Sequence, residues 1–364
     1  MTSEKNNDQS QLSEAPVLFK KDGPVGHILL NRPRALNALD LDMVDMMAAQ
    51  LKSLENDPAI KVVVVEGAGE KAFCAGGDIR GLYDARAVDD EDMLDAFYRR
   101  EYHLNHAIAN YPKPYVAMMD GITMGGGVGV SIHGRFRVVT ERTMFAMPET
   151  GIGFFPDVGG GYFLSRCPGE IGMYLGLTGA RLKAADCLYA GLATHGVHAD
   201  QVAAVKAALV QADYGSDAFA AVTEILTGFH ADMGEASLDA QRDKIDQAFS
   251  ADSVAAIFDA LGREDTAFNA DCLKTLSGKS PTALCVSFDQ IRQGRDMTLG
   301  EVLNMEFRLS QRMVRKPDLF EGVRAVIIDK DHAPKWQHGD VGQVDPREVA
   351  EYFAPLPVDR ELNL

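Results

Sequence analysis

The chain has 364 residues, of which 46% are hydrophobic and 24% charged, the composition of a globular protein with a sizeable core. Its formal net charge is -17 at pH 7. Such a surface repels nucleic acid and anionic lipid, so we expect neither nucleic acid nor a membrane as a partner. An anionic substrate would need a local basic patch to offset the global field.

The cysteine pattern and the start of the sequence bear on the cellular compartment. Five cysteines are scattered without a Cys-x-x-Cys pair, which is typical of a reducing environment. The first fifteen residues are polar and include Glu4 and Asp8, unlike a secretory signal or an acid-poor transit peptide. No apolar run reaches the length of a transmembrane helix. We therefore expect a cytoplasmic protein in which residues 1–15 form a disordered tail.

Short apolar runs alternate with helical stretches through the first 200 residues. Residues 25–30 favour a strand, and Asp40 is a candidate N-cap for the helix that follows. The apolar stripe of that helix consists of Leu41, Val44, Met47, Leu51 and Leu54. Residues 62–65 are four consecutive valines, as expected for a parallel strand covered on both faces. A helix over about 91–110 and a strand over 115–119 repeat the alternation, which indicates an α/β fold.

Strand patterns end near residue 200, and helical patterns continue to the C-terminus. We expect helices over 216–228, 238–249, 281–292 and 298–313, the last with a capping box formed by Thr298 and Glu301. The sequence therefore divides into a core of residues 16–200 and a mainly helical C-terminal region of residues 201–364.

Two glycine-rich segments each follow an apolar run. Gly76 and Gly77 lie in the first, and Gly125, Gly126 and Gly127 lie in the second. Such clusters allow close backbone approach and leave N–H groups free for an anion, although for a glycine cluster taken alone tight turns and close packing are the favoured interpretation. Neither segment completes the G-x-G-x-x-G pattern of a dinucleotide site.

Two acids, Glu149 and Asp157, lie in an otherwise apolar segment rich in glycine and proline. Burial would raise their pKa values towards the range useful for proton transfer, and proximity would separate the two values. The alternatives are a solvated loop position for Glu149 and an N-cap role for Asp157 in a helix from about Val158.

Glu101 falls on the apolar stripe of its helix, together with Phe97, Leu104 and Ile108. A carboxylate on a buried stripe must find a partner or line a polar cavity; alternatively, the helix is rotated and Glu101 reaches solvent. His103 and His106 lack a third ligand at metal-binding spacing, so we expect no metal. Cys74 is expected to be a small core residue rather than a nucleophile.

Four motifs occur in order: residues 31–39, residues 73–78, the triple glycine at 125–127, and Pro148 with Glu149. Together they resemble the enoyl-CoA hydratase/isomerase (crotonase) superfamily over roughly residues 15–200. Further segments extend the likeness to thioester hydrolases within it, namely 100–102, 121–129, 155–164, 321–325 and 329–336. The resemblance implies a spiral of ββα units followed by a helical C-terminal region.

The resemblance also implies a set of site residues. The amides of Gly77 and Gly126 would form an oxyanion hole, and the CoA moiety would pass Arg34, Ala35 and Leu36. Glu149 and Asp157 would be catalytic, and Glu101 would contact a substrate hydroxyl group. With Gly126, these three acids would also bind the acyl group. Whether Glu149 attacks the thioester or activates water stays open.

One departure from the hydratase pattern selects the subgroup. Hydratases carry a first catalytic glutamate two residues after the triple glycine, and here that position is Gly129. Losing this acid removes half of the apparatus that adds water to a double bond.

The resemblance therefore implies hydrolysis of a short 3-hydroxyacyl-CoA thioester. We expect 3-hydroxyisobutyryl-CoA, an intermediate of valine catabolism, as the substrate, with 3-hydroxypropionyl-CoA next. The alternatives are an enoyl-CoA hydratase or isomerase and a catalytically silent acyl-CoA-binding protein. We expect no cofactor beyond the CoA of the substrate. Superfamily members commonly assemble, which leaves a homo-oligomer open.

Overall fold

Two sheets form the centre of the molecule, and the chain alternates between them. In the computed structural model, which describes residues 14–88 and 90–364, the larger sheet has the order β1-β2-β3-β5-β7-β9 and the smaller one β4-β6-β8. All neighbours are parallel except β1 and β2. The larger sheet comprises β1 (Val17–Asp22), β2 (Val25–Leu30), β3 (Val62–Gly67), β5 (Tyr115–Met119), β7 (Phe136–Val139) and β9 (His195–Gly196). The smaller one comprises β4 (Ala72–Cys74), β6 (Ile122–Met124) and β8 (Met144–Ala146).

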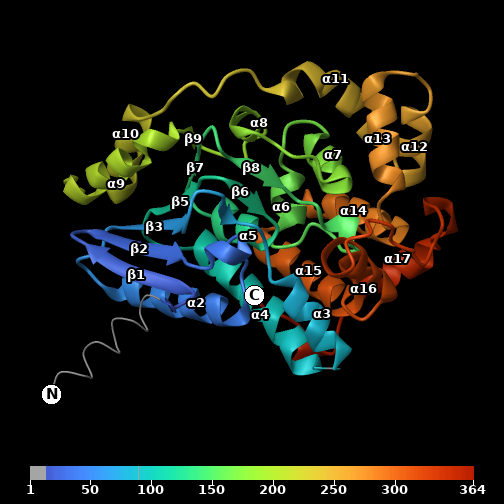
Figure 1. Ribbon diagram of the computed structural model, residues 1–364, viewed down its shortest axis with the longest axis horizontal. Helices are drawn as coiled ribbons and strands as arrows, with labels where there is room; N and C mark the ends of the chain where they lie inside the picture. The colour runs from blue at the N-terminus through green and yellow to red at the C-terminus, as the bar shows by residue number, and fades with distance from the viewer. Residues whose placement is uncertain (1–13, 89) are drawn as a thin grey trace.

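The first repeat places both of its strands, β1 and β2, in the larger sheet. From β3 to β8, each repeat contributes one strand to the larger sheet, the next strand to the smaller sheet, and then at least one helix. The helices of this part are α2 (Leu41–Asn56), α3 (Ile79–Ala87), α4 (Glu91–Ala109), α5 (Gly126–Ile132), α6 (Gly160–Leu164), α7 (Ile171–Thr178) and α8 (Ala184–Tyr189). Figure 1 shows the sheets surrounded by these helices and by the C-terminal ones. The predicted spiral of ββα units with a helical C-terminal region is confirmed.

Strand β3 explains the run of four valines. Val63 and Val65 point into the main core, whereas Val62 and Val64 point into a second core on the opposite face of the sheet. Helices α9 (Val202–Gln211) and α10 (Ala218–Gly228) cover that second core with Val205, Leu209, Val222 and Leu226. The prediction of a parallel strand covered on both faces is therefore confirmed.

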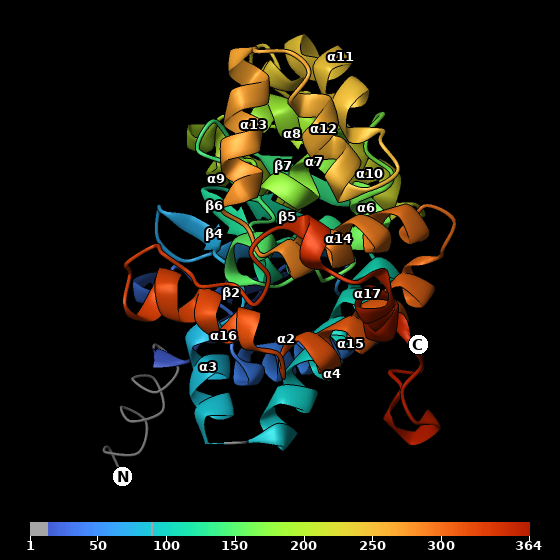
Figure 2. The same cartoon turned by 90° about the vertical axis from the view of Figure 1, so that its right-hand side faces the viewer.

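The remaining helices lie against the core along one side and one end (Figures 1 and 2). They are α11 (Ser237–Phe249), α12 (Val254–Leu261), α13 (Ala267–Ser277), α14 (Pro281–Gly294), α15 (Leu299–Met313), α16 (Pro317–Val323) and α17 (Pro346–Phe353). Helix α11 packs on α7 and α8, α14 packs on α6 and α7, and α15 packs on α4. The predicted N-cap at Asp40 and the capping box of Thr298 and Glu301 are both present.

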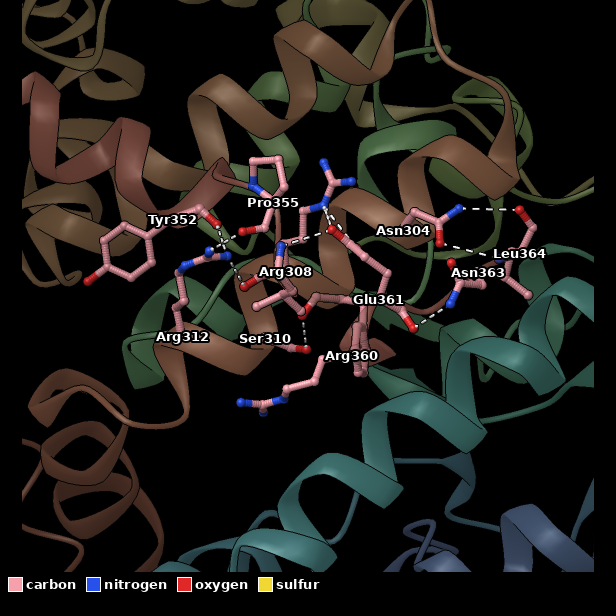
Figure 3. A network of polar contacts seen from close by, with 12 residues as sticks. Asn304, Arg308, Ser310, Arg312, Tyr352, Pro355, Arg360, Glu361, Asn363 and Leu364 are labelled. Carbon is pink, nitrogen blue, oxygen red and sulfur yellow. Dashed lines mark hydrogen bonds and ion pairs between the residues drawn. The ribbon is translucent and has the colours of Figure 1, made fainter. Parts of the chain in front are cut away.

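The C-terminal segment joins α15 to α4 (Figure 3). Arg308 of α15 donates from Nε to both carboxylate oxygens of Glu361, at 3.0 and 3.1 Å. Arg99 of α4 donates to the carbonyl groups of Glu361 and Arg360, each at 2.9 Å. Because α4 also carries Glu101, this segment helps to fix the helix behind the candidate site.

The predicted disordered tail over residues 1–15 lies outside the described residues, except for Glu14 and Ala15. Within the described part of the chain, no helix combines the length and the apolar character needed to span a membrane.

Candidate active site

The predicted site residues surround one cavity of about 890 Å³. Its walls come from the turns that follow β4 and β6, from α4, from residues 146–157 and from the C-terminal region. Gly77, Gly126, Glu101, Glu149 and Asp157 all line it. Apolar side chains make up much of the remaining wall, among them Ile79, Phe97, Met124, Ile152, Phe154 and Ile327. The five predicted residues, which span positions 77 to 157, therefore meet in one low-dielectric space together with residues of the C-terminal region.

Two backbone amides in the cavity wall have no protein acceptor. Neither the N–H of Gly77 nor that of Gly126 donates a hydrogen bond to another described residue. The two glycines are adjacent: a Cβ placed on Gly126 would lie 3.1 Å from the amide nitrogen of Gly77. It would also lie 2.6 Å from Oε1 of Glu101, so only glycine fits here without displacing a neighbour. The site can therefore offer two N–H donors to one oxygen of a ligand.

Three of the carboxyl groups that line the cavity are buried: Glu101 is 2%, Glu149 7% and Asp157 6% exposed. Burial, followed by the charge of Asp157, holds the pKa values of Glu101 and Glu149 well above their usual range. Burial also raises the pKa of Asp157 to about 7, opposed by a hydrogen bond from Tyr102. Oε1 of Glu101 and Oε2 of Glu149 have no partner among the described residues. These unpaired oxygens are available to a ligand.

The alternatives left open by the sequence can now be assigned. Glu149 is buried rather than solvated, and Glu101 faces the cavity rather than solvent. Helix α6 begins at Gly160 with Gly159 as its N-cap, so Asp157 does not cap it. Instead, Oδ2 of Asp157 accepts a hydrogen bond of 3.1 Å from the hydroxyl of Tyr102 on α4.

Gly129 has no space for a side chain. A Cβ at this position would lie 2.8 Å from Cβ of Val158 and 2.9 Å from Nδ2 of Asn105. The space that an acid would need at this position is thus filled by the residue next to Asp157. Both acids that remain on this side of the cavity come from the 149–157 segment.

The segment of residues 34–36, which we expect to contact the CoA moiety, lies only partly at this cavity. Ala35 lines it, whereas Arg34 and Leu36 are not among the lining residues. Leu36 instead accepts a hydrogen bond from the amide of Ala75 at 3.0 Å, and Leu39 pairs with Gly77 as a short parallel bridge. These contacts attach the segment directly to the turn that carries one of the free amides.

Several cavity residues were not identified from the sequence. Tyr98 lies three residues before Glu101 on α4, so helical spacing could have found it. Lys279 lies between α13 and α14, and local sequence gives no signal for its position. Burial lowers the pKa of Lys279, and the nearby charge of Glu149 opposes this. The other basic residues of the cavity wall are Arg32, Arg80, Arg181 and His332. Arg32 forms ion pairs with Asp40 and Asp78, so the wall carries basic and acidic side chains together.

Cys74 and His103 are not among the residues that line this cavity. Burial raises the pKa of the Cys74 thiol to about 12, and its Sγ faces the carbonyl of Gly76, which is consistent with a core residue. Nδ1 of His103 contacts the carbonyl of Arg99 on its own helix. Within residues 14–88 and 90–364, no group of three His, Cys, Asp or Glu side chains is arranged to hold a metal ion.

Solved structures with this fold cover nearly the whole chain. A carnitinyl-CoA dehydratase from Mycobacterium thermoresistibile is 40% identical, with a TM-score of 0.89 over 96% of this chain and 98% of its own. An enoyl-CoA hydratase from Rhodobacter sphaeroides is also 40% identical, with a TM-score of 0.88 over 96% of this chain and 100% of its own.

Curated relatives of similar length carry a different name. The 3-hydroxyisobutyryl-CoA hydrolase, mitochondrial, of Danio rerio is 46% identical over 98% of this chain and 93% of its own length. The protein of that name from Homo sapiens is 45% identical over 93% of this chain and 89% of its own.

The expectation of a cytoplasmic protein is contradicted by these relatives, whose names place them in mitochondria. That expectation rested on cysteine spacing and on the acids in the first fifteen residues. Neither feature distinguishes the cytosol from other reducing compartments, and the composition of a short polar stretch is a weak guide to targeting.

A family model described as enoyl-CoA hydratase/isomerase matches residues 25–353. The match includes both glycine turns, the buried acids and most of the C-terminal helices. It agrees with the fold of the solved relatives and with the identity to the curated ones. The chain therefore belongs to the enoyl-CoA hydratase/isomerase family.

Proposed function

We propose that this protein hydrolyses the thioester of a short 3-hydroxyacyl-CoA, with 3-hydroxyisobutyryl-CoA as the preferred substrate. The observation that carries the proposal is the pair of free amides at Gly77 and Gly126 beside buried acids, in a cavity where Gly129 excludes a further acid. The names of the curated relatives support this reaction and substrate. Release of the 3-hydroxy acid would serve valine breakdown.

The proposed mechanism begins at the two amides. The thioester oxygen accepts hydrogen bonds from Gly77 and Gly126, which stabilise the negative charge that develops as the carbonyl carbon becomes tetrahedral. Glu149 supplies the base or the nucleophile, because an ionised buried carboxylate with an unpaired oxygen is strongly basic. Asp157 orients this group and transfers the proton that the departing thiolate of CoA takes up. The reaction uses these groups and water, with no further cofactor.

Two routes through Glu149 differ in where the oxygen of water enters. In the first, Glu149 attacks the carbonyl carbon, CoA leaves, and water hydrolyses the mixed anhydride. In the second, Glu149 removes a proton from water, which attacks the thioester directly. A single turnover in oxygen-18 water distinguishes them. Water that opens the anhydride at the Glu149 carbon places label in the Glu149 carboxylate and leaves the released acid unlabelled, whereas direct attack on the thioester places the label in the released acid.

The remaining groups of the cavity suit the rest of the substrate. The free oxygen of Glu101 lies beside Gly126 and can accept a hydrogen bond from a 3-hydroxyl group. Arg80, Arg181 and Lys279 line the cavity and can donate hydrogen bonds to the phosphates of CoA. Ala35 also lines the cavity, and backbone contacts in its segment would hold the pantetheine arm of CoA.

Hydration or dehydration of an acyl-CoA is the second candidate, favoured by the names of the two solved structures at 40% identity. That reaction needs an acid and a base at the same two carbon atoms of the acyl chain. Val158 occupies the space where the first of these acids would stand in the hydratase pattern. The geometry therefore favours hydrolysis.

Thioester cleavage with 3-hydroxyisobutyryl-CoA is the first test. We expect thiol release detected by a thiol-reactive dye, no loss of conjugated absorbance with crotonyl-CoA, and a decrease of about 100-fold or more in kcat for Glu149→Gln. The matched control is Glu224→Gln, an exposed glutamate on α10, which should retain wild-type activity. Hydration of crotonyl-CoA without thiol release would refute the proposal, and full activity of E149Q would refute the catalytic assignment.

Gly126→Ala tests the two amides. The added methyl group would crowd Glu101 and the amide of Gly77, so the thioester oxygen could not reach both donors. We expect a loss of about 100- to 1,000-fold in kcat, the usual cost of losing one such donor. Gly228→Ala is the control, because nothing lies within 4 Å of the added atom. Activity of G126A within a few-fold of wild type would contradict the role of this amide.

The pH profile should report the coupling of the two acids. Since Glu149 acts in its ionised form, kcat/KM should decrease as the pH falls below its raised pKa. The charge of Asp157 contributes to that raised pKa. Asp157→Asn removes the charge, so the acid limb should move to lower pH although the maximal rate decreases. An acid limb that stays in place or moves to higher pH would show that Asp157 does not influence Glu149.

Burying Glu149 should also cost stability at neutral and alkaline pH. Its folded pKa exceeds its unfolded one, so the folded state binds more protons above about pH 4.5, and the unfolding free energy decreases as the pH rises. Glu149→Gln removes this penalty. We expect thermal unfolding of E149Q at a higher temperature than wild type at pH 8, with a difference that shrinks towards pH 4.5. An equal difference at both pH values would contradict the raised pKa.

A further inference from the structure

The loop that carries Asp157 has an unfavourable backbone conformation, which contacts from outside the loop must stabilise. Val158 has a φ of +51°, a conformation that β-branched residues rarely adopt, and Gly159 follows at +85°. Such a backbone persists only where surrounding groups determine it. Asp157 itself receives one hydrogen bond, from Tyr102, which orients its carboxylate but leaves the next residues to other contacts.

Glu306 of α15 provides the main contacts. Its Oε2 accepts a hydrogen bond of 2.6 Å from the amide of Gly159, and its Oε1 accepts one of 2.9 Å from the amide of Gly161. The carboxylate is fully buried, and within the described residues it forms no ion pair with a basic side chain. A carboxyl group buried without a cation is costly, so its retention calls for a specific reason.

Two further side chains complete this support. Gln290 of α14 is also fully buried, and its Nε2 donates to Oε1 of Glu306 at 2.8 Å and to the carbonyl of Pro156 at 2.7 Å. The carbonyl of Val158 accepts a hydrogen bond of 2.7 Å from Nε2 of His133. Burial lowers the pKa of His133 to about 4, so this ring is neutral and carries its proton on Nε2. Every residue from 156 to 161 except Asp157 and Gly160 is therefore bonded to one of these three groups.

The arrangement requires an acceptor with two free oxygens. Three donors converge on Glu306: two backbone amides and the amide group of Gln290. A carboxylate accepts all three, whereas a glutamine side chain must turn its own N–H groups towards at least one of them. Glu306 does not line the catalytic cavity, so it cannot touch the substrate.

We propose that Glu306 is a positioning residue that sets the rate of the hydrolysis by holding the 156–161 loop, and so the carboxylate of Asp157, in its reactive place. The inference rests on the proposed function, since it assigns Glu306 a part in that reaction. It also means that α15, near the C-terminus, determines the geometry of an acid that lies about 150 residues earlier.

Glu306→Gln tests the proposal through the separation of kcat from KM. We expect kcat to decrease about 10- to 100-fold, because small displacements of a catalytic group have effects of this size. KM should change little, since the cavity wall is unaltered. Glu301→Gln, five residues earlier on the same helix, is the control: Glu301 is exposed and belongs to the capping box, which glutamine also satisfies. An E306Q protein with wild-type kcat would overturn the proposal.

A double-mutant cycle with Asp157→Asn tests whether Glu306 acts through Asp157. If it does, E306Q should lower kcat strongly in the wild-type background and only slightly in the D157N background. An equal decrease in both backgrounds would overturn the proposal, because it would mean that Glu306 affects the rate independently of Asp157. A merely structural role would not produce this difference at temperatures where both proteins are folded.

Gln290→Met gives a second variant if E306Q does not fold. Methionine keeps the length of the side chain but cannot donate to Glu306 or Pro156. We expect a several-fold decrease in kcat with the same dependence on Asp157, and unchanged kcat would overturn the proposal. Failure of the proposed function looks different, since wild-type protein would then release no thiol from any 3-hydroxyacyl-CoA.

Discussion

The burial of three carboxyl groups in one apolar cavity is the constraint on which the rest of the structure depends. Water would stabilise Glu101, Glu149 and Asp157 as anions, and the cavity withdraws that stabilisation, so their pKa values rise. Each anion would also repel the others, so ionisation of Asp157 raises the pKa values of Glu101 and Glu149 further. The same site can then hold an ionised acid and a protonated one, which is what a hydrolysis that first removes and then returns a proton needs.

Glycine serves the site by making room. Because Gly126 has no side chain, its amide lies close to both Gly77 and Glu101. Because Gly129 has none, Val158 packs at the position where the hydratase pattern carries an acid. Glycine at position 129 is linked to the conformation of the loop. Val158 fills the space beside Gly129 and also adopts the positive φ that follows Asp157. An acid at 129 and the present loop would compete for one volume. The chemistry is therefore selected by packing as well as by the identity of the acids.

Much of the fold could be predicted from local patterns, and part of the site could not. The four valines of β3, the N-cap at Asp40 and the capping box at Thr298 each follow from rules that act over a few residues. Glu101 was found from its place on an apolar helical stripe, and Glu149 and Asp157 from their apolar surroundings. The roles of these acids and of the glycines were predicted from the resemblance to a known family. Lys279, His133 and Glu306 gave no such signal, since each acts on a segment that only the tertiary fold brings near.

The C-terminal region thus forms part of the wall of the candidate site. Lys279 and residues 326–334 close one wall of the cavity, and α15 contributes Glu306 beneath the loop of Asp157. Helix α15 is itself fastened to α4, which carries Glu101 and Tyr102, by way of Arg308, Arg99 and the residues around Glu361 (Figure 3). The elements that carry the acids of the cavity are therefore held in place by contacts with one another. Buried acids repel one another when they ionise. The contacts between these elements therefore hold the carboxyl groups in the positions that cleavage of one thioester requires.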